Sequence, residues 1–532
     1  MAETSYDCIV IGSGPGGYVA AIRAAQLGKK TAVVEKDAVG GRCLNYACIP
    51  AKALLRSADL LSEIRDAGEF GLKVSGVEVD YPAVQARREK VVSTLTSGVG
   101  GLFKKNGIDL LEGEASLGPR GGGGSDSDSG GRVTVRVGGG ELTAATVILA
   151  AGSVPRAIGG VSLGGRVLGT EEAWALPELP ARLAVVGAGA SGAEIASGFA
   201  RLGSEVLLLE ALDRVLPTED ADISRLVERG LKRQSIAVHT STPIESVQVG
   251  DSSVGFTYGS DSAEVDYLVI AAGRGPDVQA LGLDGAGVEL DEHGLVKVDG
   301  ALRTSAAGVY AIGDLVAGPA LAHKASDEGI IAVEDSAGLQ THPLAYIDIP
   351  RATFCTPNVG SFGLTEAQAR EQGYDVVVGK VPYGAVGGGT VYGDRTGLVK
   401  LVGERSYGEL LGGHIVGARD RADPGARQRA RAGGRLHRGR AHRPRPPDAV
   451  GGGHGGWPRR GRLADPRLIL SPPRSLGDAS HRLAVIMSCV QHRFAVGPGS
   501  PICMAMFRAV DCRRLVMRID RRIRIEVDLC CS

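Results

Sequence analysis

Two stretches of the 532-residue chain repeat one pattern: an apolar run, a glycine-rich turn, a helix-like run, and a second apolar run that ends in a glutamate. The first stretch carries Gly12, Gly14, Gly17 and Glu35, and the second carries Gly187, Gly189, Gly192 and Glu210. In such a unit the first glycine permits a tight turn and the second lets the backbone approach a pyrophosphate at the helix N-terminus. The third allows the helix to pack closely on the strand. A glycine turn alone is weak evidence, but the strand, helix and terminal acid together predict two dinucleotide-binding units.

The acid at the end of each second strand stands where a carboxylate can bind a ribose hydroxyl. Glu210 favours NAD over NADP, because a carboxylate repels a 2′-phosphate. Both units favour an α/β fold with two Rossmann-like domains.

The rest of the chain divides around these units. Residues 1–150 and 275–345 are expected to form the two parts of one dinucleotide-binding domain, and residues 151–274 to form the other. In residues 346–419, strand-like runs surround one helical run, which predicts an incomplete α+β interface domain.

The net charge of zero hides two different segments. Residues 420–532 contain 23 Arg, no Lys and 9 acidic residues, so this segment carries +14 and residues 1–419 carry −14. The tail also holds five of the nine cysteines, and its apolar residues show no periodicity. We therefore expect residues 420–532 to be a largely disordered tail.

No apolar run is long enough to span a bilayer, and no basic leader precedes the first apolar run. These features predict a cytoplasmic protein without a membrane partner. Lasting disulfides are rare in the cytosol, so a close cysteine pair there indicates redox chemistry or metal binding.

Cys43 and Cys48 form such a pair in "GGRCLNYACIPAKALL". In a regular helix, residues five apart are too distant for a disulfide. A bridge therefore requires a distorted or looped segment, which the glycine-rich approach and Pro50 allow. Zinc is disfavoured because residues 1–419 have no second ligand pair, and we predict no metal site. Two unrelated buried thiols remain an alternative.

The motifs "GSGPGGYVAAIRAAQLG", "GGRCLNYACIPAKALL", "AIGD", "LAHKASDEG" and "IPRATFCTPNVGSFGLTEAQAREQGYDV" resemble the FAD-dependent pyridine nucleotide–disulfide oxidoreductases. Within that family the resemblance is to the dihydrolipoamide dehydrogenases, over residues 1–419. It implies that Cys48 lies against the flavin and that Cys43 exchanges with the substrate. It implies electron flow from protein-bound dihydrolipoamide through the cysteines and FAD to NAD.

The resemblance also implies further roles. Lys52 would approach the flavin and pair with Glu194 near the nicotinamide. FAD would be bound by Gly12, Gly14, Gly17, Glu35, Ala115, Asp314 and Ala322. NAD would be bound by Gly187, Gly189, Gly192, Glu210 and Gly273. The implied partners are lipoyl domains of a 2-oxoacid dehydrogenase or glycine cleavage complex, and a second copy of the chain.

Several residues depart from the family pattern. Arg42, Tyr46, Ala47 and Ala51 replace the commoner Thr, Val, Gly and Ser of the cysteine box, and "AAGRGPD" replaces "VGRRPN". The C-terminal motif H-x-H-P-T-x-x-E, whose His is the base for the partner's cysteines, is missing. His323 and His414 are then the remaining candidates for a base, although both look structural.

The tail has the properties of a frameshift. Degenerate codons for residues 441–455, read from the second base, permit the missing motif, and the absence of Lys fits GC-rich DNA read out of frame. We therefore expect this chain to be an impaired dihydrolipoamide dehydrogenase whose dimer is in doubt. The alternatives are another disulfide reductase of the family, of mercuric or glutathione type, and a basic-tailed binding protein, although nucleic-acid binding is disfavoured.

Overall fold

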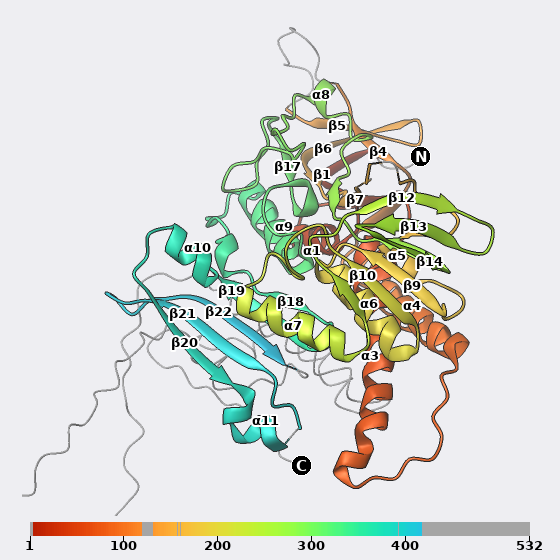
Figure 1. Ribbon diagram of the computed structural model, residues 1–532. Helices are drawn as coiled ribbons and strands as arrows, with labels where there is room; N and C mark the ends of the chain where they lie inside the picture. Colours follow the sequence, from red (N-terminus) through yellow and green to blue (C-terminus); the bar gives the residue numbers. More distant parts are fainter. Residues whose placement is uncertain (1–3, 120–130, 157, 160, 392, 418–532) are drawn as a thin grey trace, which may run out of the picture. The chain divides into compact units, whose positions relative to one another are not determined.

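The computed structural model describes residues 4–119, 131–156, 158–159, 161–391 and 393–417 (Figure 1). The predicted tail, residues 420–532, and most of the glycine- and serine-rich loop at residues 119–131 lie outside the described residues. Within the described ranges, every helix is too short or too polar to cross a membrane.

The first sheet is mostly parallel. Its strands lie in the order β3-β2-β1-β6-β5-β4, and β17 also pairs with β6. The strands are β1 (Ser5–Ile11), β2 (Thr31–Glu35), β3 (Asp109–Glu112), β4 (Ala115–Leu117), β5 (Val133–Val137), β6 (Gly140–Leu149) and β17 (Val309–Ala311). Strands β1, β2, β3, β6 and β17 pair in parallel, whereas β4 and β5 add an antiparallel edge. Helices α1 (Pro15–Gln26) and α9 (Ala322–Ser336) pack side by side, although about 300 residues separate them in the chain.

The second sheet is entirely parallel, in the order β11-β10-β9-β15-β8. Its strands are β8 (Val167–Gly169), β9 (Arg182–Val186), β10 (Glu205–Leu209), β11 (Ala237–His239) and β15 (Tyr267–Ile270). Its helices are α5 (Thr170–Trp174), α6 (Ala190–Leu202) and α7 (Ala221–Arg233), and an antiparallel sheet is formed by β12 (Ile244–Val249), β13 (Val254–Tyr258) and β14 (Asp261–Val265). The central strands of both parallel sheets are buried apolar runs, as expected where a sheet is covered on both faces.

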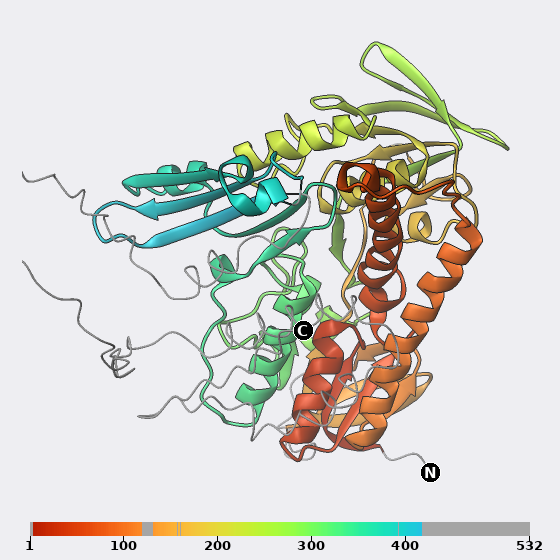
Figure 2. The same ribbon diagram turned by 90° about the horizontal axis from the view of Figure 1, so that it is seen from below.

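Two short strands form an antiparallel pair: β7 (Ser153–Pro155) and β16 (Arg274–Pro276). Strand β7 follows β6 of the first sheet, and β16 follows β15 of the second sheet. Three helices connect strand β2 to the edge strand β3 of the first sheet: α2 (Gly41–Asn45), α3 (Cys48–Arg65) and α4 (Tyr81–Lys105). The long helices α3 and α4 pack against each other (Figure 2). Short helical segments are η1 (Asp66–Phe70), α8 (Leu283–Ala286), η2 (Gly313–Leu315) and η3 (Tyr346–Asp348).

The last described segment forms an antiparallel sheet in the order β18-β19-β22-β21-β20. It contains β18 (Arg351–Thr353), β19 (Asn358–Gly363), β20 (Val376–Pro382), β21 (Leu398–Glu404), β22 (Leu410–Gly417), α10 (Glu366–Glu371), η4 (Tyr383–Ala385) and α11 (Gly387–Val391). The predicted fold class, two Rossmann-like parallel units and an α+β unit, is confirmed.

Candidate active site

The first glycine turn has the backbone geometry that its spacing predicts. Gly12 has a φ of 100°, in a region that L side chains rarely adopt. A Cβ on Gly17 would stand 1.9 Å from the carbonyl oxygen of Gly12, whereas a Cβ on Gly14 would meet nothing within 4 Å. Gly12 and Gly17 therefore shape the turn itself, and Gly14 leaves open space at the start of α1.

The acid Glu35 closes this turn at the end of β2. The backbone amide of Ser13 donates to its Oε2 at 2.8 Å, and the amide of Asp37 donates to its Oε1 at 3.0 Å. Gly113, just after β3, donates its amide to the Glu35 carbonyl at 2.8 Å. The buried Ala115 begins β4 two residues further on.

The second glycine turn repeats this arrangement. Gly187 also has a φ of 100°, and a Cβ on Gly192 would stand 1.8 Å from the Gly187 carbonyl oxygen, while Gly189 is open. The amide of Ala188 donates to Glu210 Oε2 at 2.7 Å. The two turns are therefore equivalent, one at the start of α1 and the other at the start of α6.

Cys43 and Cys48 form a disulfide with a Cα–Cα distance of 4.8 Å. Cys43 lies in α2 and Cys48 begins α3; the helical path is broken between them at Ala47, whose φ and ψ are −125° and −86°. Pro50 lies in the first turn of α3, where a missing N–H costs no helical hydrogen bond. The break predicted from the spacing of the cysteines is therefore present.

The segment that carries the disulfide lies directly on the first glycine turn. Gly41, at the start of α2, approaches so closely that a Cβ on it would stand 2.7 Å from the Cα of Gly14. The amide of Gly40 donates to Ser13 Oγ at 3.0 Å. The fold thus places the start of the disulfide-bearing helix α2 directly against the first glycine turn.

The other described cysteines are chemically different. Cys8 and Cys355 are free thiols and fully buried, and burial raises the pKa of each to about 12. Thiols with such pKa values form little thiolate at neutral pH, so they are poor nucleophiles.

Lys52 and Glu194 form an ion pair of 2.8 Å between α3 and α6. The Glu194 side chain is 6% exposed, and its Oε1 also accepts the backbone amide of Phe354 at 2.9 Å. The Lys52 ammonium lies 4.6 Å from the centre of the Phe354 ring. This pair therefore joins the helix of the disulfide to the second glycine unit and to the antiparallel domain.

Asp314 lies in η2, directly after β17. Strands β17, β6 and β1 are parallel neighbours, so Asp314 and Gly12 lie at the same carboxyl-end edge of the sheet. Ser153 donates to Asp314 Oδ2 at 2.5 Å. The preceding Gly313 is held by the buried pair of Lys324 and Glu328. Lys324 Nζ donates to the Gly313 carbonyl at 2.8 Å, and the Gly313 amide donates to Glu328 Oε2 at 2.7 Å.

The remaining predicted positions lie at element ends. Ala322 begins α9, and Gly273, with a φ of 106°, lies between β15 and β16. The described residues contain no cluster of His, Cys, Asp and Glu suited to a metal ion.

The two histidines considered as substitute bases are both held by backbone carbonyls. His323 Nε2 lies 2.8 Å from the Pro350 carbonyl and His414 Nε2 lies 3.0 Å from the Leu364 carbonyl. Burial lowers the pKa of both imidazoles, and His414 is fully buried in β22. In both histidines the Nε2 atom is therefore engaged by the backbone rather than by another side chain.

Five residues near the site were not predicted to have a role in it: Gly41, Arg42, Ser153, Glu171 and Arg274. Arg42 and the segment that contains Arg274 were noticed only as departures from the family pattern. The one local signal for Gly41 is the glycine pair before Cys43, because the partner of Gly41 is 27 residues earlier in the chain.

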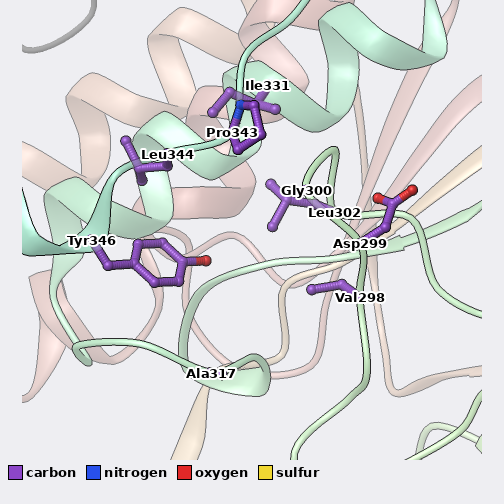
Figure 3. Close-up of a pocket in the computed structure, with 9 residues that line it drawn as sticks. All are labelled: Val298, Asp299, Gly300, Leu302, Ala317, Ile331, Pro343, Leu344 and Tyr346. Atoms are coloured by element: carbon purple, nitrogen blue, oxygen red, sulfur yellow. The ribbon is translucent and has the colours of Figure 1, made fainter.

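A cavity of about 270 Å³ lies elsewhere in the first domain (Figure 3). It is lined mainly by apolar side chains, among them Val298, Leu302, Ile331 and Leu344, with the Tyr346 ring at one side. It shares no residue with the predicted site, and Tyr346 uses its hydroxyl to bind Glu328.

Known proteins match this chain over most of its described length. The model of the pyridine nucleotide-disulphide oxidoreductases matches residues 6–329, and the model of their dimerisation domain matches residues 349–423. A dihydrolipoyl dehydrogenase of Rhizobium etli is 42% identical over 433 residues, which cover 79% of this chain and 90% of that protein. One of Bacillus subtilis is 40% identical over 426 residues, covering 78% and 89%.

Solved structures agree with these matches. LpdA from Mycobacterium tuberculosis superposes with a TM-score of 0.71 at 25% identity, covering 78% of this chain and 90% of that one. The HOCl-induced flavoprotein disulfide reductase RclA from Escherichia coli gives a TM-score of 0.67 at 27% identity, covering 77% and 89%. The resemblance seen in the motifs is confirmed, and the chain belongs to the pyridine nucleotide–disulphide oxidoreductase family.

Proposed function

We propose that the chain is built to oxidise protein-bound dihydrolipoyl groups with NAD, through the Cys43–Cys48 disulfide and FAD. One observation carries the proposal: the segment that bears the disulfide packs on the first glycine turn, where Gly41 lies against Gly14. This packing brings the disulfide-bearing segment next to the turn at which we expect a dinucleotide to bind. The identity of 40–43% to dihydrolipoyl dehydrogenases supports this substrate class.

The residues of the first turn fit the adenosine and pyrophosphate of FAD. Gly14 offers open space at the N-terminus of α1, where backbone amides and the helix dipole favour a phosphate. Glu35 would bind the ribose, Ala115 would contact the nucleotide through its backbone, Asp314 would bind the ribityl chain, and Ala322 would lie beside the flavin. Bound FAD supplies the two-electron relay between the dithiol and the nicotinamide.

The second turn fits NAD for the same reasons. Gly189 is open at the start of α6, Glu210 stands at the ribose position, and Gly273 follows the neighbouring strand β15. The carboxylate of Glu210 would disfavour the 2′-phosphate of NADP. Lys52, fixed by Glu194, would place a positive charge between the two cofactors.

The cysteines carry the exchange with the substrate. A dihydrolipoyl thiolate attacks Cys43 Sγ, the Cys43–Cys48 bond breaks, and Cys48 leaves as the thiolate. The second substrate thiol then displaces Cys43, which releases lipoyl disulfide and leaves both cysteines reduced. One two-electron oxidation of the substrate thus balances one reduction of the protein disulfide.

This exchange needs a base, and we propose that this chain lacks it because residues 420–532 are read out of frame. The match to a dimerisation domain supports a homodimer in which the family's His–Glu pair would serve the partner's cysteines. Without that pair, dihydrolipoamide oxidation is expected to be slow, by roughly a factor of a hundred or more. Dye reduction by NADH needs no such base and is expected to remain.

The test compares the purified chain with one whose codons after residue 419 are read in the second-base frame. Both chains should bind flavin and reduce a dye with NADH, and only the reframed chain should oxidise dihydrolipoamide rapidly. Cys43→Ser in the reframed chain is the control, and it should abolish only the dihydrolipoamide reaction. Full dihydrolipoamide oxidation by the original chain would contradict the missing base, and activity only with mercuric ion or glutathione disulfide would contradict the substrate.

A further inference from the structure

A chain of polar contacts connects the disulfide segment to Asp314. Arg42, the residue before Cys43, donates from its Nε to Glu171 Oε1 and from its Nη2 to Thr170 Oγ1, at 3.3 Å in the second case. The same Glu171 oxygen forms an ion pair with Arg274 Nη1 at 3.0 Å. One carboxylate therefore lies between two guanidinium groups.

The series of polar contacts continues from Arg274 to Asp314 in the first domain. Arg274 Nε donates to Ser153 Oγ at 2.9 Å, and that hydroxyl donates to Asp314 Oδ2 at 2.5 Å. Arg274 and Ser153 also belong to the paired strands β16 and β7, where the chain passes between the two dinucleotide units. The paired strands β7 and β16 thus lie between Asp314 and Glu171 in this series of contacts.

The side chains of this chain of contacts are partly shielded from solvent. Arg42, Glu171 and Arg274 are 30%, 24% and 19% exposed. At this burial a charge-assisted hydrogen bond holds its partners more firmly than an exposed ion pair does. The helix α2 has only five residues and no side-chain cap, so contacts outside it must fix its orientation.

We propose that Glu171 is a positioning residue for the exchange cysteine: through Arg42 and Arg274 it holds the Cys43-bearing helix α2 against the paired strands β7 and β16. The proposal rests on the function proposed above, because it concerns how that disulfide forms. Two thiols form a disulfide readily when they are held close together, since the effective concentration of one at the other is then high. Loosening α2 lowers this effective concentration and favours the reduced dithiol.

The reduction potential of the Cys43–Cys48 couple is the measurement that tests this. In the full chain, the fractions of dithiol and disulfide are measured by thiol alkylation across dithiothreitol redox buffers at neutral pH. Glu171→Gln and Arg42→Met are each expected to shift the equilibrium toward the dithiol by about tenfold, or about 30 mV. Arg42→Lys, which keeps the charge, should restore part of the shift, and Glu172→Gln, the neighbouring carboxylate, should leave the potential unchanged.

The two substitutions separate positioning from simple electrostatics. Removing the negative charge of Glu171 would favour cysteine thiolates, whereas removing the positive charge of Arg42 would disfavour them. Electrostatics alone would therefore shift the two potentials in opposite directions, while loss of positioning shifts both toward the dithiol. In the double variant the shift should be no larger than in the stronger single variant, because both substitutions break one contact.

Opposite shifts, or potentials equal to that of the wild type, would overturn the proposal. Arg42→Met keeps the Arg274–Glu171 pair, so it remains measurable if Glu171→Gln loses flavin. A wild-type chain without flavin or without a reducible disulfide would overturn the proposed function and this inference together. A normal wild-type couple with unchanged variants would overturn only the inference.

Discussion

Gly14 and Gly189 are the open glycines of their turns, since an added methyl group would meet no atom within 4 Å in either place. Both have extended backbone conformations that any residue can adopt, with φ values of −61° and −68°. Their neighbours Gly17 and Gly192, in contrast, are packed against backbone carbonyls. The fold therefore requires the packed glycines, whereas only a ligand would require the open ones.

Gly189→Ala should weaken NAD binding without unfolding the chain. A methyl group in the space proposed for the pyrophosphate is expected to raise the KM for NADH in dye reduction by roughly tenfold, or about 1.4 kcal/mol of binding. Thermal unfolding should be unchanged. Gly100→Ala, in α4 and equally open, is the matched control, and a KM for Gly189→Ala equal to that of this control would argue against NAD at this turn.

Lys400 connects one strand to two helices. From β21 it reaches Asp220 and Asp222 at the start of α7, each at 2.8 Å, and Glu366 in α10 at 2.9 Å. Its side chain is only 3% exposed. Burial alone would raise the pKa of Asp220, but hydrogen bonds from Lys400 and from backbone amides lower it overall. The second dinucleotide unit and the antiparallel domain are thus held together by a buried charge cluster.

Lys400→Met should destabilise the chain by about 3 kcal/mol at pH 7, because it leaves the three carboxylates without their shared cation. Urea unfolding measures the change. Lys380→Met is the matched control: this lysine pairs with Asp222 and is 46% exposed, so its loss should cost less than about 1 kcal/mol. Equal effects of the two substitutions would show that burial of the cluster is unimportant.

The sign of the pH dependence follows from the lowered carboxylate pKa values of Asp220 and Glu366. A carboxyl group whose pKa is lowered in the folded state adds stability above its unfolded pKa, about 4, and loses it as the pH falls through the folded value. The difference between wild type and Lys400→Met should therefore shrink below about pH 4.

Glu194 is a meeting point of three parts of the chain. It lies in α6, its carboxylate pairs with Lys52 of α3, and it accepts the amide of Phe354 next to β18. Ser197, one turn further along α6, accepts the Thr356 amide at 3.0 Å. The disulfide helix, the second dinucleotide unit and the antiparallel domain are therefore tied together through one face of α6.

Glu194→Gln should affect both stability and electron transfer. The amide oxygen can still accept the Phe354 amide, but Lys52 loses its counter-charge, which is expected to cost about 1–3 kcal/mol of stability. Dye reduction by NADH should slow as well, since Lys52 would lose its fixed position near the proposed cofactor sites. Glu205→Gln, on an exposed position of β10, is the control. A normal rate of dye reduction in Glu194→Gln would show that the Lys52–Glu194 pair is structural only, which would contradict its proposed role in electron transfer.

The sequence by itself determined the local features of this protein. The glycine spacings predicted both turns, because a tight turn and a close helix–strand contact depend on residues within five positions of each other. The spacing of Cys43 and Cys48 predicted a break in the helix for the same reason. The missing C-terminal histidine motif is also a statement about sequence alone.

Only the tertiary structure decided which of these local features lie together. Gly41 meets Gly14 across 27 residues, Arg42 meets Glu171 across 129, and Lys400 meets Asp220 across 180. No periodicity or spacing encodes such contacts, because they arise when separate sheets and helices pack, and their energy depends on the burial that packing creates. The glutamate that joins Arg42 and Arg274 was therefore visible only once the chain had folded.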